Sequence, residues 1–181
     1  MLNSSMRNNW GGKCTREWPC KKMSCKHCVF KRREYFLRNG GAFVRKHSLN
    51  VHFTISWPLT AGEDYWSKIL TIYPALRKKL SPRIGKHIWV LGIGEIKRTP
   101  HVHYLITEES VNLVYTYAKK IRKVNVITHV KKANDPETLL GYLYDKNFVP
   151  ATSDPERPPR TRVMSGSRGM RYGFPPTKKK K

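Results

Sequence analysis

Four short segments of the chain alternate apolar and polar residues with a period of two, and this pattern limits the possible folds most strongly. They cover residues 48–57, 87–97, 100–107 and 124–130. In the first, Leu49, Val51, Phe53 and Ile55 share one face. A period of two is typical of a half-buried β-strand, so one face of each segment should contact a core.

Three segments with helical spacing separate or follow these strands, at residues 63–72, 110–121 and 134–148. Asp135 is placed as the N-cap of the last one, with Pro136 in its first turn. Only a few residues join the second and third strands, which predicts an antiparallel hairpin. The order βαββαβα therefore predicts an α+β protein with a four-stranded antiparallel sheet, on the ferredoxin-like plan.

The chain carries a large excess of positive charge, with 36 Lys and Arg against 12 Asp and Glu and a formal net charge of +24. Such a field favours a polyanionic partner, and we expect a nucleic acid. No apolar run approaches the length of a membrane span, and residues 1–13 lack the apolar core of a secretory signal. These features predict a cytoplasmic protein without a membrane partner.

All four cysteines lie within residues 14–28, with the spacing C-x5-C-x4-C-x2-C. Four thiolates can close a tetrahedral zinc site, which would stabilise a segment that has no core of its own. The predicted zinc ligands are Cys14, Cys20, Cys25 and Cys28. The helix that follows, residues 29–38, should end at Gly40 and Gly41, and its Lys31, Arg32 and Arg33 are expected to contact phosphates.

Changes in composition divide the chain into four parts. Residues 1–13 are expected to be a flexible N-terminus, residues 14–41 a zinc module with its basic helix, and residues 42–149 the main α+β domain. Residues 150–181 are rich in Pro, Gly, Ser and basic side chains. Since such a segment has little apolar surface to bury, it is expected to be a flexible basic tail.

The third strand carries His101 and His103, which must emerge on the same side of the sheet because they are two residues apart. Glu95, near the end of the second strand, could reach both imidazoles across the predicted hairpin. Two imidazoles and one carboxylate leave open positions on a divalent ion, as a catalytic metal site requires. We therefore predict a metal site at these three residues.

The last helix carries Tyr142 and Lys146, four residues apart and hence on one helical face. A phenol is a poor nucleophile at neutral pH, and a nearby ammonium and a metal-polarised phosphate would both ease its attack. Tyr144 points elsewhere and shares a face with Leu140, so we interpret it as a packing residue.

Three of these segments together resemble the motifs of rolling-circle replication initiators of the HUH endonuclease superfamily. Residues 52–58, HFTISWP, resemble the first motif, and residues 100–106, PHVHYLI, match the histidine–hydrophobic–histidine second motif. Residues 142–146, YLYDK, match the Y-x-x-x-K form of the third. The resemblance extends over about residues 42–148, and the predicted order of strands and helices agrees with the family's fold.

The resemblance implies an enzyme that nicks and rejoins single-stranded DNA, or a DNA hairpin, at a replication origin. Tyr142 would be the only nucleophile and would form a 5′-phosphotyrosine, with Mg²⁺ or Mn²⁺ held by His101, His103 and Glu95. Lys97 and Arg98, in the connection between the hairpin strands, would contact the DNA. No P-loop occurs in the sequence, so a host helicase would unwind the duplex and a host polymerase would copy it.

Other functions remain open from the sequence. A single-tyrosine transposase or relaxase of the same superfamily shares these motifs. A non-catalytic, zinc-containing nucleic-acid-binding protein would explain the charge and the cysteines, but it leaves H-x-H and Y-x-x-x-K without a role. A plain RNA-binding module would expose aromatic residues on its central strands, where this chain has His, Glu and Thr.

Overall fold

The computed structural model describes Cys25, residues 28–93, 99–120, 126–159 and 161–166, and Met170. Five of the predicted site residues lie outside these ranges, namely Cys14, Cys20, Glu95, Lys97 and Arg98. The other predicted site residues are all described. Among the described residues, no helix has both the length and the apolar character needed to cross a membrane.

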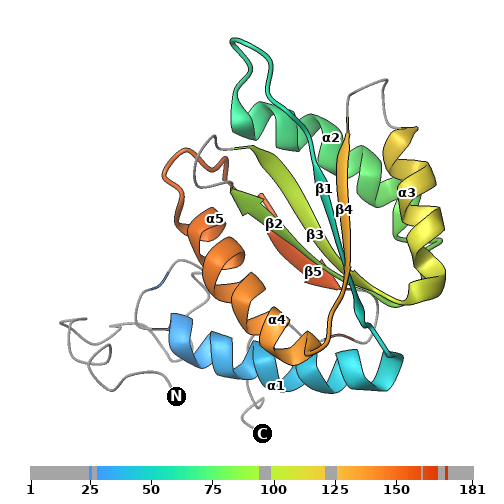
Figure 1. The fold of residues 1–181 in the computed structure, drawn as a ribbon. Helices are drawn as coiled ribbons and strands as arrows, with labels where there is room; N and C mark the ends of the chain where they lie inside the picture. The colour runs from blue at the N-terminus through green and yellow to red at the C-terminus, as the bar shows by residue number, and fades with distance from the viewer. Residues whose placement is uncertain are drawn as a thin grey trace, which may run out of the picture.

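The centre of the protein is an antiparallel sheet with the strand order β4-β1-β3-β2-β5 (Figure 1). Its strands are β1 (Val51–Ser56), β2 (Ile88–Ile93), β3 (Pro100–Ile106), β4 (Ile127–Lys132) and β5 (Met164–Gly166). The predicted β2–β3 hairpin is confirmed, with Ile88 paired to Leu105 and Gly92 to His101. The predicted α+β class with an antiparallel sheet is confirmed, and β1 to β4 alternate with helices along the chain in the predicted order.

Helices cover both faces of this sheet (Figure 1). On one face, α2 (Tyr65–Leu80) and α3 (Val111–Lys119) pack on the apolar side of β1 and β3, where Val51, Phe53 and Ile55 are buried. On the other face lie α1 (Val29–His47), α4 (Pro136–Leu143) and α5 (Val149–Ser153). A short 3-10 turn, η2 (Glu108–Ser110), leads into α3.

Helix α1 runs straight through Gly40 and Gly41, so the prediction that these residues end the helix is wrong. Both glycines are buried where α1 contacts α4. A Cβ atom at Gly40 would lie 3.2 Å from Leu140, and one at Gly41 would lie 2.9 Å from Glu137. The glycines therefore let two helices approach closely, and α1 extends past the boundary predicted at residue 41.

The segment that carries the predicted nucleophile is not one regular helix. Asp135 caps the start of α4 through bonds from the backbone N–H groups of Glu137 and Thr138, as predicted. After Leu143 the chain forms a π-helical turn, η3 (Tyr144–Phe148), and then continues as α5. Single π-helical turns inserted between α-helices occur frequently at functional sites.

Part of the predicted flexible tail is packed against the sheet, which corrects the boundary drawn at residue 150. Ala151, Val163 and Met164 are at most 4% exposed, and Met170 is 7% exposed. Residues 164–166 form β5 and pair with β2. The apolar residues of this segment are too widely spaced to show a period, but Ala151, Val163, Met164 and Met170 belong to the hydrophobic core.

The contact between α1 and α4 gives a test of the fold. Gly40→Val should lower the free energy of unfolding by about 1–3 kcal/mol, because the added atoms meet Leu140 in a packed interface. Ala42→Val, two residues along the same helix but exposed, should change it by less than about 0.5 kcal/mol. Urea unfolding of both variants measures the difference, and equal stabilities would contradict this helix contact.

Candidate metal and nucleophile site

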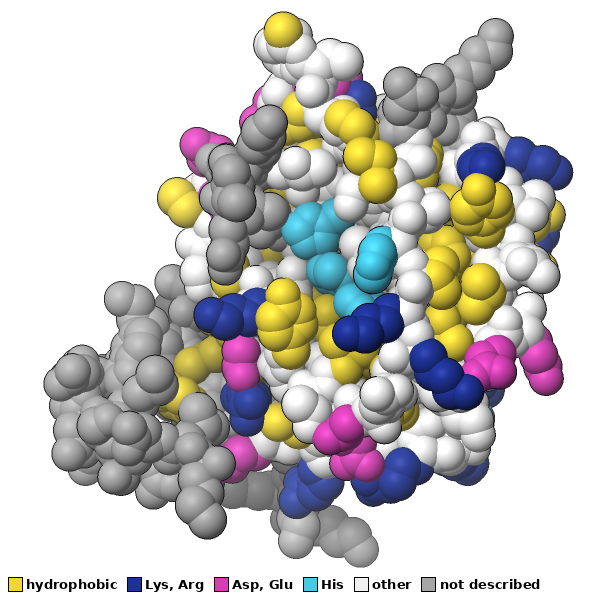
Figure 2. Space-filling model, in the orientation of Figure 1, with side chains coloured by type: hydrophobic (Ala, Val, Ile, Leu, Met, Phe, Trp, Pro, Cys, Tyr) yellow, Lys and Arg dark blue, Asp and Glu magenta, His cyan; other side chains and the backbone are white. Residues whose placement is uncertain are grey.

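The pairing of β1 with β3 gathers polar side chains on one face of the sheet. Thr54 lies opposite His103 and Ser56 opposite His101, and His52 lies two residues before Thr54 on the same face. The rings of His101 and His103 are 4.8 Å apart between centroids, so the prediction that both imidazoles emerge together is confirmed. Figure 2 shows the histidines near the centre of this face, with Lys and Arg side chains on either side.

His103 is the centre of this group, and its Nδ1 atom contacts two residues of β1. The distances are 2.9 Å to His52 Nε2 and 3.0 Å to Thr54 Oγ1. Neither residue was assigned a role from the sequence, although both belong to the segment that resembles the first motif. The polar face of β1 was visible in the alternation of residues 51–56, but only the register of the sheet brings it against His103.

Asn147, in the π-helical turn η3, reaches the other side of the same imidazoles. Its Oδ1 atom lies 3.1 Å from His103 Nε2 and 3.3 Å from His101 Nε2. The approach is possible because residue 92 is glycine, since a Cβ atom there would overlap both His101 Nε2 and Asn147 Oδ1. Sequence reasoning missed Asn147 because an asparagine in a helical segment does not indicate a site by itself.

The environment keeps His52 and His103 neutral. Burial, together with the neighbouring charges of His101 and His52, lowers the pKa of His103 to about 3. Burial, followed by the charges of His129 and Lys131, lowers the pKa of His52 to about 4. A neutral imidazole has a free nitrogen lone pair, which is the form that binds a metal ion.

The tautomer of His101 follows from its backbone contact. His101 Nδ1 lies 2.8 Å from the carbonyl oxygen of Thr99, which can only accept a hydrogen bond. The proton of the neutral ring is therefore on Nδ1, and the lone pair is on Nε2, the atom that faces Asn147. A backbone carbonyl behind a histidine in this way is the usual means of orienting a metal ligand.

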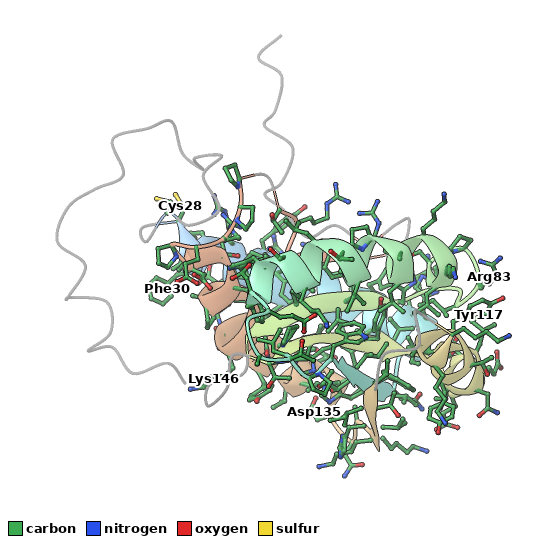
Figure 3. All side chains as sticks on the ribbon, turned by 90° about the horizontal axis from the view of Figure 1, so that it is seen from above. Cys28, Phe30, Arg83, Tyr117, Asp135 and Lys146 are labelled. Atoms are coloured by element: carbon green, nitrogen blue, oxygen red, sulfur yellow. The ribbon has the colours of Figure 1, made fainter. Side chains whose placement is uncertain are left out.

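The two predicted catalytic residues are exposed on the surface of the same segment. The Tyr142 side chain is 54% exposed, and Lys146 is exposed and points away from the body of the protein in Figure 3. Tyr144 is 1% exposed and packs against Phe36 and Phe148, so its predicted packing role is confirmed. Its burial raises the pKa of the Tyr144 phenol, which makes it a poor nucleophile.

An ion pair between Arg33 and Asp145 fixes the π-helical turn to α1. The guanidinium Nε and Nη2 atoms each lie 2.7 Å from a carboxylate oxygen, which is the bidentate geometry. The hydrogen bond to Asp145 raises the pKa of Arg33. Tyr144 adds a second link, because its hydroxyl donates to the carbonyl oxygen of Val29 at 3.2 Å.

These contacts correct the predicted phosphate contacts on α1. Arg33 is engaged with Asp145, and Arg32 is 3% exposed, so neither side chain is presented to a phosphate. Lys31 is 62% exposed and forms only a surface ion pair with Glu34, at 3.6 Å, so a phosphate can still reach it. On the face of the histidines, Lys131 lies beside His52 on the neighbouring strand and is exposed.

The structure places two of the three predicted metal ligands, His101 and His103. Within the described ranges, no group of three or more His, Cys, Asp or Glu side chains is arranged to hold a metal ion. The predicted third ligand, Glu95, follows the last residue of β2 by two positions and lies outside those ranges.

Comparison with known proteins finds no relative of this chain. No protein-family model, no curated protein and no solved structure matches it. The geometry of the histidine face and the motifs in the sequence are therefore the features that indicate a function.

The close contact at Gly92 can be tested without a functional assay. Gly92→Ala should destabilise the protein by about 1–3 kcal/mol, because the methyl group must displace His101 or Asn147 from a packed contact. Ser56→Ala, opposite His101 in the register, adds no atoms and is the control. If urea unfolding finds Gly92→Ala as stable as the wild type, His101 and Asn147 do not meet over residue 92 in solution.

Proposed function

We propose that this protein is a replication initiator of the HUH endonuclease type, which nicks and rejoins single-stranded DNA through Tyr142. The observation that carries the proposal is the meeting of His101 and His103 with the segment that presents Tyr142. Both Nε2 atoms lie within 3.3 Å of Asn147, which is five residues after Tyr142 in the same helical segment.

The arrangement of the sheet supports the proposal. The order β1-α2-β2-β3-α3-β4, with strands placed as β4-β1-β3-β2, follows the ferredoxin-like plan on which the resembled family is built. His101 and His103 lie on a central strand of this sheet. The polar face of the sheet carries His52 and Thr54, not the exposed aromatic residues of an RNA-binding sheet.

The side chains fit a hard divalent cation such as Mg²⁺ or Mn²⁺. His103 is neutral, and His101 is oriented by Thr99 so that its Nε2 lone pair faces the same point. An amide oxygen and imidazole nitrogens are suitable ligands for Mn²⁺, and an amide oxygen also suits Mg²⁺. Once bound there, the ion would withdraw charge from a phosphate oxygen and ease attack on the phosphorus.

In the proposed reaction the Tyr142 oxygen attacks the phosphorus of the scissile phosphodiester. The phenol gives up its proton, the bond from phosphorus to the 3′-oxygen breaks, and the 3′-oxygen takes up one proton and leaves as a hydroxyl group. The step therefore releases no net proton, and the 5′-phosphate stays bonded to Tyr142. Lys146, one turn further on, is placed to stabilise the developing phenolate or the phosphate. Attack of a 3′-hydroxyl on the phosphotyrosine reverses the reaction and rejoins the strand, so no external energy source is consumed.

The basic surface is consistent with a DNA substrate inside the cytoplasm of a host cell. The chain has a formal net charge of +24, and sequence-independent phosphate contacts would account for most of its affinity. Because Arg32 is buried and Arg33 is paired with Asp145, we assign these contacts to the exposed Lys131 and to Lys31 and Lys132, whose ion pairs with Glu34 and Glu108 lie at the surface.

The proposed enzyme can be tested with single-stranded DNA that contains a randomised segment, since the recognition sequence is unknown. With Mn²⁺, wild-type protein should give an adduct that survives denaturation and carries the 5′-phosphate side of the cut. Tyr142→Phe should give none, because no phenolic oxygen remains. Tyr115→Phe is the matched control, since Tyr115 is another exposed tyrosine, on α3.

His101→Ala and His103→Ala should reduce adduct formation at least a hundredfold while DNA binding survives. An adduct of normal yield in Tyr142→Phe would contradict the proposed nucleophile. A normal yield in both histidine variants in the presence of EDTA would contradict the metal mechanism.

We also propose that the cysteine cluster binds a structural zinc ion. Two of its four members are described, and both lie at the start of α1, where Cys28 is buried. The backbone N–H groups of Cys28 and Val29 donate to the carbonyl oxygen of Cys25, which forms the tight turn that a C-x2-C knuckle requires. The amino-terminal end of a helix also favours thiolates over thiols.

Elemental analysis of protein purified without added metal should find about one zinc per chain, since thiolate sites hold zinc tightly. Cys25→Ser should lower the zinc content and destabilise the start of α1, but it should leave Mn²⁺ binding at the histidines unchanged. A zinc content near zero in folded wild-type protein would refute the zinc module.

A further inference from the structure

Asn147 lies against the histidines of the polar sheet face, and the metal site predicted from the sequence gives this residue no role. Its side chain is 4% exposed, and its Oδ1 atom lies between the Nε2 atoms of His101 and His103. The other end of the amide, Nδ2, is buried and has no hydrogen-bond partner among the described residues. A buried amide with one end left without a hydrogen-bond partner is uncommon and requires a physical reason.

When the His101 ring is neutral, its contact with Asn147 joins two electron-rich atoms. In the neutral ring the proton is on Nδ1, held by the Thr99 carbonyl, so Nε2 presents a lone pair to Asn147 Oδ1 at 3.3 Å. An amide oxygen carries lone pairs and no proton. The two atoms therefore cannot form a hydrogen bond with each other.

The contacts of His103 also allow its Nε2 atom to present a lone pair to Asn147. Its Nδ1 atom can donate to His52 Nε2 at 2.9 Å or to Thr54 Oγ1 at 3.0 Å. With its proton there, the lone pair of His103 is on Nε2 and also faces Asn147 Oδ1, at 3.1 Å. In this tautomer three lone pairs converge on one point, an arrangement that a bound cation stabilises.

Rotating the amide by half a turn does not remove the problem. It would bring Nδ2 between the two imidazoles, where it could donate to both, but it would move Oδ1 into the buried position that Nδ2 now occupies. One end of the amide would still lack a partner among the described residues. With Oδ1 facing the histidines, a cation can bind this oxygen together with the two Nε2 atoms.

The separations also fit a metal site. Ligands at adjacent corners of an octahedron are about 3.0 Å apart when each is about 2.1 Å from the ion. The distances from Asn147 Oδ1 to the two Nε2 atoms, 3.1 and 3.3 Å, are close to this value. Gly92 is what allows the three atoms to approach so closely.

We propose that Asn147 is a ligand of the divalent ion and binds it through Oδ1 beside His101 and His103. The assignment rests on the proposed metal site and extends it. The π-helical turn that carries Asn147 also follows Tyr142 and is fixed to α1 through Asp145 and Arg33. Binding of the ion would therefore position the nucleophile segment over the sheet, and Glu95 is not required to complete a three-ligand site.

The test measures Mn²⁺ binding to the full-length protein without DNA, from the loss of the free-ion signal in electron paramagnetic resonance. Asn147→Leu keeps the size of the side chain but removes the oxygen, and it should weaken Mn²⁺ binding at least tenfold. Asn147→Asp keeps the shape and adds a charge, and it should bind Mn²⁺ at least as tightly as the wild type. Circular dichroism and urea unfolding check that each variant is folded.

His103→Ala and Glu95→Gln serve as references, the first expected to lose binding and the second to keep it. Wild-type affinity in Asn147→Leu, with loss in His103→Ala, would overturn the role of Asn147 while the proposed function stands. Weaker binding in Asn147→Asp would also overturn it, even if Asn147→Leu does not fold. Absence of Mn²⁺ binding in the wild type, or full binding in His103→Ala, would instead remove the metal site and with it the proposed function.

Discussion

The antiparallel register between β1 and β3 is the constraint on which the rest of the site depends. It places Thr54 opposite His103 and brings His52 within hydrogen-bonding distance of the same imidazole. Side chains of a strand alternate between faces, so a shift of one residue would send these groups into the apolar core. The burial of Val51 and Phe53 on the opposite face holds the register. Packing of the apolar face therefore determines which polar side chains meet on the other face.

The site also requires that the segment from α4 through η3 lies over this polar face, so that Asn147 reaches His101 and His103. Gly40 allows α1 to approach α4, and the Arg33–Asp145 ion pair joins the π-helical turn to α1. On its side facing the sheet, the same turn contacts both histidines of β3 through Asn147. The turn is thus fixed between a helix and a sheet, which are rigid elements suited to holding a site in place.

Much of the fold could be predicted because the periods of its segments are local properties of the sequence. The same reasoning placed His101 and His103 together, since two residues apart on a strand means one face. Asn147 could not be predicted, because the π-helical turn changes the phase of the helix and only the folded sheet shows what the amide contacts. Gly40 and Gly41 were misread as a helix end because glycine favours both helix ends and close helix packing, and the sequence alone does not distinguish the two.

In the proposed site, two imidazoles and an amide oxygen hold one divalent ion beside the segment that carries Tyr142. Anomalous X-ray diffraction from crystals soaked in Mn²⁺ tests this most directly, because it locates the ion without an assay or a DNA substrate. We predict one strong peak on the polar face of the sheet, about 2.0–2.3 Å from His101 Nε2, His103 Nε2 and Asn147 Oδ1. A peak bound only away from these atoms, or none at saturating Mn²⁺, would contradict it.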